Sequence, residues 1–523
     1  MINTRVRILN DIEAWILDPD AQQICWITGM AGTGKTSIAK TICERATVST
    51  DITLGGSFFC SRSTGLASQR DIRCVVPTLT QLFARKSAQF CLAVADIIDP
   101  GIQYKEVRAQ VEQILHPPLL ALRSHCLPIL FVIDALDECG GETSDGMLDD
   151  ASCHAVVTSM LEALVSLTQS DPKLPVKFLV TSRPETQIRD TSISDEKFSQ
   201  ILRLHAVDSE EVNGDISRYI TTTLNTKLSS KPKLRAMITD GEVDYLIRLC
   251  DGLFIVAATA LKHTFGAGAD AAVAKFKGLL NASRDSLNAG ASSSLDNMYA
   301  IILMEASRLD GSEDTDLPAL LRLLVSLLAT RSKLSIDTLA ELLGQQSYDV
   351  RASLSCLHSV VHVPEDDDMP GLRTVHALFG DYLHVRAPER IRFSRLFGQT
   401  ILAHACLNEM ARRLHFNISH SPSSYHPNPT TRLPSISLAL EYACLHWAHH
   451  IAASKPRGDA TSNPPSDLFD AEIGHKFRPK FLFWLEVLSV LGKIGLAPGM
   501  LSISHAVVSP CYESSRHTES ATG

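Results

Sequence analysis

The sequence predicts an α/β core built on a doubly wound parallel sheet, followed by all-α domains. Short apolar runs alternate with helical patterns up to about residue 205, which is the order of a parallel sheet with crossover helices. A glycine-rich loop joins the first apolar run to a helix. From residue 206 onward, the apolar residues recur mainly at helix spacing.

The composition is that of an ordinary globular protein. The chain has 523 residues, of which 45% are hydrophobic and 20% are charged, and its net charge is −9. This negative balance argues against a nucleic-acid partner. Thirteen cysteines without paired spacing and the lack of a membrane-spanning apolar run predict a soluble, cytoplasmic protein.

The first apolar run, residues 24–27, leads into residues 29–36, which fit the GxxxxGK[ST] pattern of a phosphate-binding P-loop (Walker A). The backbone N–H groups of such a loop surround phosphates at the N-terminus of the next helix. We expect Lys35 to reach the β- and γ-phosphates and the Thr36 hydroxyl to bind Mg²⁺. The predicted nucleotide contacts are Gly29, Gly32, Thr33, Gly34, Lys35, Thr36 and Ser37.

A second apolar run ends in a cluster of acids, in "PILFVIDALDECGG" (128–141). Asp134 stands at the end of the run and is predicted to hold Mg²⁺. Asp137 and Glu138 follow one turn later, where a carboxylate can polarise the attacking water. The sequence leaves open which of the two carboxylates has this role.

A third apolar run, in "VKFLVTSRPE" (176–185), ends at Arg183. Ligands of parallel α/β sheets bind beyond the carboxyl ends of the strands. We therefore expect Arg183 to meet the γ-phosphate, where a cation stabilises the transferring charge. The runs 54–60 and 201–204 complete a set of five predicted strands.

The three motifs GMAGTGKT, DALDE and TSRPE together resemble the NACHT class of STAND P-loop NTPases, the regulated signalling ATPases that include the NOD-like receptors. The sequence is also similar to the nephrocystin-like NACHT modules of mushroom-forming fungi. The resemblance covers residues 4–500 and is strongest over 4–265. In this family Asp134 resembles the Walker B acid, Arg183 resembles the sensor-1 arginine, and Phe254 replaces the proline of the GxP nucleotide-contact motif.

The resemblance implies a switch with ATP or ADP and Mg²⁺ as its cofactors. Such a protein binds and slowly hydrolyses ATP, and it changes between a closed ADP state and an open ATP state that forms a homo-oligomer. The implied setting is fungal signalling similar to innate immunity or cell death. The absence of an NKxD tetrapeptide disfavours GTP.

Beyond the core, the helical pattern resembles the lid of STAND proteins, and a helix, helix, helix, hairpin order resembles their winged helix. This region lacks a basic stripe, so DNA binding is not expected. The resemblance places His376 where a histidine contacts the β-phosphate of ADP. The predicted domains are the core (1–205), the lid (206–282), the winged helix (295–388), a C-terminal helical domain (389–502) and a disordered tail (503–523). Residues 283–294, rich in small side chains, are predicted to be a linker between the lid and the winged helix.

Three histidines, His446, His449 and His450, have the spacing of one helix face. No cysteine or HExxH pattern accompanies them, so helix packing is favoured over metal binding. The sequence leaves two alternatives to the hydrolysing switch. One is a non-hydrolysing nucleotide-binding scaffold or truncated NACHT fragment, with no room for an effector domain before the P-loop. The other is a small-molecule kinase, which the long helical extension disfavours.

Overall fold

The computed structural model describes most of the chain, and the described residues fall into two compact units. Unit 1 comprises Met1–Ser144 and Leu148–Ile302, and unit 2 comprises Asp145–Met147 and Leu303–Gly523. The described residues are 4–61, 67–97, 106–123, 127–139, 150–266, 268–288, 293–309, 319–355, 357–364, 371–421, 435–454 and 473–508.

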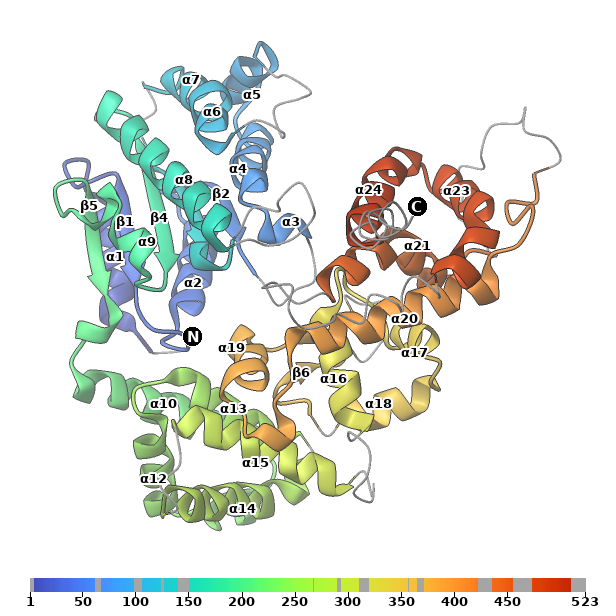
Figure 1. Ribbon diagram of the computed structural model, residues 1–523. Helices are drawn as coiled ribbons and strands as arrows, with labels where there is room; N and C mark the ends of the chain where they lie inside the picture. Colours follow the sequence, from blue (N-terminus) through green and yellow to red (C-terminus); the bar gives the residue numbers. More distant parts are fainter. Residues whose placement is uncertain are drawn as a thin grey trace, which may run out of the picture. The chain divides into compact units, whose positions relative to one another are not determined.

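Unit 1 is built on a five-stranded sheet in which all neighbouring strands are parallel (Figure 1). The strand order is β2-β3-β4-β1-β5, so β4 lies between β3 and β1. The loops that follow these three strands therefore meet at one edge of the sheet. The strands are β1 (Ile24–Thr28), β2 (Thr53–Phe59), β3 (Ile129–Asp134), β4 (Val176–Ser182) and β5 (Ser199–Arg203).

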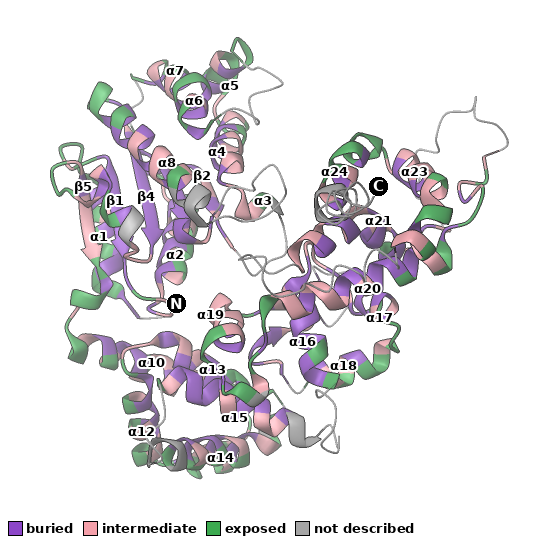
Figure 2. Ribbon diagram, in the orientation of Figure 1, coloured by how far each residue is buried: buried purple, intermediate pink, exposed green. Residues whose placement is uncertain are grey.

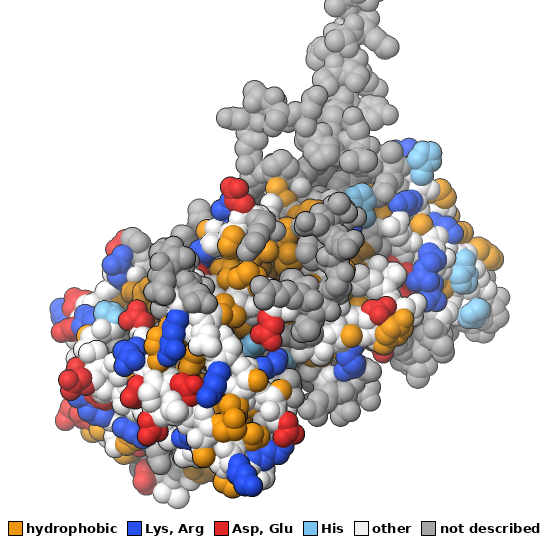
Figure 3. Space-filling view, turned by 90° about the horizontal axis from the view of Figure 1, so that it is seen from below, with side chains coloured by type: hydrophobic (Ala, Val, Ile, Leu, Met, Phe, Trp, Pro, Cys, Tyr) orange, Lys and Arg blue, Asp and Glu red, His pale blue; other side chains and the backbone are white. Residues whose placement is uncertain are grey.

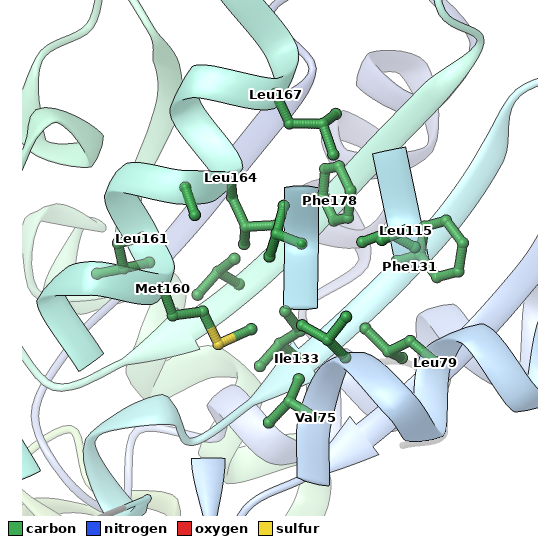
Figure 4. Packing of buried hydrophobic residues seen from close by; sticks show 14 of the residues in the cluster. Val75, Leu79, Leu115, Phe131, Ile133, Met160, Leu161, Leu164, Leu167 and Phe178 are labelled. Atoms are coloured by element: carbon green, nitrogen blue, oxygen red, sulfur yellow. The ribbon is translucent and has the colours of Figure 1, made fainter. Parts of the chain in front are cut away.

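Both faces of the sheet are covered, because alternate strand residues feed two separate apolar cores. Every residue of β1, β3 and β4 is buried, as Figure 2 shows for β1 and β4. In the first core, the rings of Phe131 and Phe178 stack with centroids 5.5 Å apart (Figure 4). The helices packed on this face include α4 (Val75–Ala84) and α8 (Asp150–Ser170).

The second core lies on the opposite face of the sheet. Ile27 and Leu179 pack there against α1 (Val6–Leu17) and α2 (Lys35–Val48). Helices on both faces confirm the predicted doubly wound α/β fold. The remaining described helices of this part are α3 (Ala67–Arg70), α5 (Ala88–Ala95), α6 (Val107–Gln110), α7 (His116–Leu120) and α9 (Thr186–Arg189).

The part of unit 1 that follows β5 is helical, as its sequence pattern predicts. A capping box of Thr239 and Glu242 starts α12. The next helix runs in a new direction because Asp251 and Gly252 both have left-handed backbones, with φ of 45° and 74°. The helices are α10 (Ser209–Lys227), α11 (Pro232–Ala236), α12 (Asp240–Cys250), α13 (Phe254–Phe265) and α14 (Ala269–Asn288).

The prediction of a linker at residues 283–294 is wrong in its first half, because α14 continues to Asn288. Ser283 is buried, and the Arg284 guanidinium lies 4.5 Å from the centre of the Tyr245 ring. These contacts extend the helix through a segment rich in small residues. Residues 289–292 of the predicted linker lie outside the described residues.

In unit 2, the three helices between residues 319 and 355 are followed by a two-stranded antiparallel pair, β6 and β7, which is the predicted order. Its C-terminal part has an aromatic core, in which the rings of Trp447 and Trp484 meet edge to face at 6.1 Å. The elements are α15 (Ser294–Leu309, which continues from unit 1), α16 (Ala319–Ala329), α17 (Ile336–Leu343), α18 (Ser347–Ser355), β6 (Val361–His362), β7 (Arg373–Thr374), α19 (Ala377–Asp381), α20 (Arg395–Arg413), α21 (Leu438–Ala453), α23 (Phe481–Val490) and α24 (Ala497–Val508).

The last helix corrects the predicted boundary of the tail. Helix α24 continues to Val508, so residues 503–508 are helical instead of disordered. Ser504 is buried and its hydroxyl donates to the Leu501 carbonyl, which supports the final turns. Residues 509–523 lie outside the described residues.

The face of the molecule in Figure 3 carries acidic and basic side chains side by side. No large area of a single charge is visible on that face. Among the described residues, no helix combines the length and the apolar character needed to cross a lipid bilayer.

Candidate nucleotide-binding site

The loop after β1 has the backbone that its glycines predict. Gly32 and Gly34 have φ values of +83° and +97°, a region that favours glycine. The Thr33 hydroxyl donates to the Met30 carbonyl at 2.8 Å and closes the loop. Helix α2 starts directly afterwards, with Gly34 as its N-cap, so its first N–H groups border the loop. Two predicted contacts flank this turn: Gly29 directly after β1 and Ser37 in the first turn of α2.

Lys35 is buried and its ammonium group points back into the loop. Its Nζ donates to the carbonyl oxygens of Gly29 at 2.7 Å and Met30 at 3.0 Å. Burial lowers the pKa of Lys35, and the nearby acids Asp137, Asp134 and Glu138 oppose that shift. The ammonium is thus a desolvated donor between the loop carbonyls and a cluster of carboxylates.

Asp134 ends β3 and is almost completely buried, at 1% exposure. Its Oδ1 accepts a hydrogen bond from the Thr181 hydroxyl at 2.6 Å, and the Thr36 side chain also hydrogen bonds to it. Burial raises the pKa of Asp134, although Thr181, Thr36 and Lys35 act in the opposite direction. The structure therefore brings together Thr36 and Asp134, the two predicted Mg²⁺ ligands, and their oxygens are of the kind that Mg²⁺ prefers.

The acidic turn after β3 depends on a left-handed residue, Ala135, with a φ of 54°. The Ala135 N–H donates to the Thr181 hydroxyl at 2.9 Å, and its carbonyl accepts from the Glu138 N–H at 2.8 Å. These bonds form a short 3₁₀ turn, Leu136–Glu138. The turn places Asp137 and Glu138 beside the end of β4.

Arg183 follows β4 and meets both of these acids. Its backbone N–H donates to Asp137 Oδ1 at 2.9 Å, and its Nε lies 3.1 Å from Asp137 Oδ2. Its Nη2 lies 4.0 Å from Glu138 Oε1. The Asp137 side chain is 4% exposed and that of Glu138 is 17% exposed. The predicted P-loop, acids and arginine therefore form one cluster at the carboxyl edge of the sheet.

Sequence reasoning did not find Arg5, which also reaches the P-loop. This residue is 1% exposed, and its Nη2 donates to the Thr33 carbonyl at 3.3 Å. Its backbone N–H donates to Asp215 of α10 at 2.9 Å, and its guanidinium lies 5.1 Å from the centre of the Phe254 ring. Its Nε and Nη1 atoms are buried, and among the residues that the structure describes they have no hydrogen-bond partner. The periodic spacing of apolar residues does not mark a single buried arginine. The sequence therefore offers no signal that Arg5 contacts the P-loop.

The start of α13 lies against the same loop. The Ile255 N–H donates to the Gly32 carbonyl at 3.3 Å. A methyl group added to Gly32 would lie 2.3 Å from Ile255 Cγ2, so the helix packs directly on the glycine. The neighbouring Phe254 ring lies 6.4 Å from that of Tyr219, centre to centre. This is the segment aligned above with the GxP motif, and its backbone contacts the P-loop.

His376 belongs to unit 2 and caps helix α19. Its Nδ1 accepts from the Leu378 N–H at 3.2 Å. The contact of His376 with a β-phosphate remains a prediction.

The three histidines of α21 are part of the packing of unit 2. The His450 ring bonds to the Tyr442 hydroxyl at 2.8 Å and to Gln399 Oε1 at 2.6 Å. Burial lowers the pKa of His446 to about 3 and that of His449 to about 4. In the described part of the chain, no group of three His, Cys, Asp or Glu side chains is arranged to hold a metal ion.

Part of the chain is similar to proteins that are already known. Residues 3–183 match the family model of the N-terminal part of nephrocystin 3. The chain is 25% identical over 526 aligned residues to the vegetative incompatibility protein HET-E-1 of Podospora anserina. That alignment covers 92% of this chain but 35% of HET-E-1, so the chain spans about a third of its relative.

Two solved structures are similar at a lower level. One is of Drosophila ORC bound to DNA, with 14% identity and a TM-score of 0.30, covering 74% of this chain and 97% of the other. The other is Cdc6p from Pyrobaculum aerophilum, with 11% identity and a TM-score of 0.28, covering 77% and 95%. The family and sequence matches confirm the resemblance that the motifs carry: residues 3–183 are similar to the N-terminal part of nephrocystin 3, and the chain is similar to HET-E-1.

Proposed function

We propose that the chain is a signalling NTPase of the STAND type, which binds MgATP and hydrolyses it slowly to switch between two conformations. The observation that carries the proposal is the cluster of Lys35, Asp134, Asp137, Glu138 and Arg183 at the end of a P-loop. The name of the relative HET-E-1, a vegetative incompatibility protein, supports a role in cell-death-like signalling.

In this proposal the phosphates replace interactions that Lys35 makes within its own loop. Its ammonium now donates to two neutral carbonyl groups. Phosphate oxygens are charged acceptors, and charge-assisted hydrogen bonds are about twice as strong as neutral ones. A bound phosphate would also offset the burial that lowers the Lys35 pKa. The N-terminus of α2 adds further N–H donors and a partial positive charge.

Thr36 and Asp134 would hold Mg²⁺, which neutralises phosphate charge when bound. The two side chains already hydrogen bond to each other, so neither needs to move far to share an ion. Thr181 fixes the orientation of the Asp134 carboxylate through Oδ1.

The geometry favours Glu138 over Asp137 as the carboxylate that orients the attacking water. Both Asp137 oxygens are engaged by Arg183 and the side chain is nearly inaccessible. The Glu138 side chain is more exposed and its contact with Arg183 is longer. Asp137 would then serve to position Arg183 toward the γ-phosphate, where the guanidinium stabilises developing charge.

The contact between Gly32 and Ile255 gives the nucleotide a way to influence the helices that follow the sheet. A rearrangement of the loop on phosphate binding would move the carbonyl to which the Ile255 N–H is bonded. We propose that this contact couples the loop to α13, and that His376 stabilises the closed ADP state. Oligomer formation in the ATP state completes the proposed switch.

The test is to measure nucleotide binding and phosphate release by the purified chain with MgATP. The proposal predicts slow release of phosphate by the wild type. Glu138→Gln should bind ATP but release little phosphate. Lys35→Ala should bind neither ATP nor ADP. ATP that stays bound and intact on the wild type would favour the non-hydrolysing scaffold, and phosphate transfer to an acceptor other than water would favour a kinase.

A further inference from the structure

Two buried cysteines face each other beside the acidic turn. Cys60 directly follows β2 and Cys139 directly follows the turn Leu136–Glu138. Their Sγ atoms lie 2.6 Å apart, although 79 positions separate them in the sequence. Both thiols belong to the apolar core on the first face of the sheet.

The backbone holds the two cysteines next to each other. Strands β2 and β3 pair up to Phe59 and Asp134, and the Cys60 N–H then donates to the Asp134 carbonyl at 2.9 Å. The 3₁₀ turn brings the chain back, with the Cys139 N–H bonded to the Leu136 carbonyl at 3.1 Å. Sulfurs so placed need only a small approach to reach the disulfide length of about 2.05 Å.

We propose that Cys60 and Cys139 form a dithiol that a low-molecular-weight disulfide, such as oxidised glutathione, converts to an intramolecular disulfide. The thiolate of one cysteine attacks the oxidant, releases one glutathione thiol and leaves a mixed disulfide. The thiolate of the other cysteine then displaces the second glutathione. The two protein thiols lose two protons and two electrons, and the oxidant becomes two molecules of glutathione.

Such a bond would act on the acidic turn. It ties the residue that follows Glu138 to the end of β2, and so fixes the segment that carries Asp137 and Glu138. Burial raises the pKa of Cys60, so its thiolate is scarce and the reaction should need a local opening of the turn. The disulfide itself does not depend on the proposed function, but its effect on ATP turnover does.

The test begins with the full wild-type chain incubated with oxidised glutathione, after which free thiols are blocked in denaturant. Cleavage by trypsin leaves Cys60 in the peptide 46–62, and cleavage after Glu138 and Glu142 isolates Cys139 in 139–142. We expect these two peptides to be linked, and to separate on reduction. The link should be absent from Cys60→Ala and Cys139→Ala.

Cys74 supplies the matched control, because it is half-buried and packs against the same core. Cys74→Ala should still form the link between the two peptides. A link of Cys139 to Cys74, stable glutathione adducts, or unlinked peptides in the wild type would each overturn the proposal. These outcomes are read on the unmutated protein, so a variant that fails to fold leaves the test intact.

A second readout measures MgATP turnover before and after oxidation. We expect turnover to fall by on the order of tenfold and to return on reduction, because misplacing a catalytic group by about 1 Å costs up to about a hundredfold. The Cys60→Ala variant should be insensitive to the oxidant. If the peptides are linked but ATP turnover is unchanged, the predicted effect on the acidic turn is wrong. If the protein forms the link but does not turn over ATP even when reduced, the result counts against the proposed ATPase function.

Discussion

Arg183 holds Asp137 by two separate groups, its backbone N–H on Oδ1 and its Nε on Oδ2. The pair joins the end of β4 to the acidic turn after β3. Arg183 is thereby placed by Asp137, while Glu138 lies at the far end of the same guanidinium. The two acids look alike in sequence, but this arrangement gives them different roles. Asp137 positions Arg183, and Glu138 is the candidate for orienting the attacking water.

Exchanging the two acids for their amides should therefore give different results. Asp137→Asn removes the charge that pairs with a partly buried guanidinium, so we expect the free energy of unfolding to fall by about 1–3 kcal/mol. Glu138→Gln should leave the Tm nearly unchanged and reduce ATP turnover by roughly a hundredfold or more. Thermal melts and phosphate release check both variants. Full turnover by Glu138→Gln, with loss of turnover in a stable Asp137→Asn protein, would reverse the assignment.

Asp134→Asn should impair Mg²⁺ binding without lowering the stability of the nucleotide-free protein. Burial raises the pKa of Asp134, so the folded state favours the protonated carboxyl. The stability that this protonation gives is therefore lost as the pH rises from the pKa of the unfolded state through the pKa of the folded state. At neutral pH the charged form costs stability, and a neutral isostere removes that cost. We expect the nucleotide-free Tm to stay the same or rise, while the extra stabilisation that Mg²⁺ gives in the presence of ATP is lost. A marked fall in the nucleotide-free Tm would contradict this account of Asp134.

Gly32→Ala should disturb both the P-loop and α13. The new methyl group meets Ile255 at 2.3 Å, and the φ of +83° strains any residue with a Cβ. We expect a loss of nucleotide affinity and a lower Tm. Adding Ile255→Ala should restore part of the Tm, since it removes the steric clash and leaves the backbone strain.

A matched control is Gly278→Ala in α14, where a methyl group meets no atom within 4 Å. Alanine is favoured over glycine inside a helix by up to about 1 kcal/mol. This variant should be neutral or stabilising. An equal loss in both glycine variants would show that the Gly32 effect does not come from Ile255 or from the loop.

Arg5→Ala should weaken the attachment of the N-terminal segment to the P-loop and to α13. It removes the bond to the Thr33 carbonyl and the contact with the Phe254 ring. Interactions of this kind contribute roughly 1–3 kcal/mol in a buried site, so we expect a clear fall in Tm. The control is Arg7→Ala, since Arg7 is largely exposed and its ion pair with Glu211 contributes little. Equal melting temperatures of the two variants would argue against a structural role for Arg5.

The sequence predicts the central part of this molecule well for a physical reason. Strands that are buried on both faces read as continuous apolar runs, and the P-loop needs its glycines in a fixed order. The five predicted strands and the cluster of Lys35, Asp134 and Arg183 are present as a result. The placement of Arg183 follows from one rule, that parallel strands present their carboxyl ends at a common edge.

Other features could not be predicted, because they depend on contacts between distant residues. The N-terminal segment that carries Arg5 is bonded to α10, 210 positions away in the sequence. The Cys60–Cys139 pair depends on the register of β2 and β3. The predicted linker at 283–294 and tail at 503–523 extended too far, because tertiary contacts made helices of their small and polar residues. The role of Asp137 also required the position of Arg183 in space.

The central claim, nucleotide binding through Lys35, is tested most directly by the nucleotide that the purified protein carries. The chain is purified without added nucleotide and denatured, and the released nucleotide is identified by chromatography. The account predicts a stoichiometric amount of ADP from the wild type and none from folded Lys35→Ala. A wild-type protein that releases no nucleotide, and whose Tm does not rise with MgATP or MgADP, would contradict it.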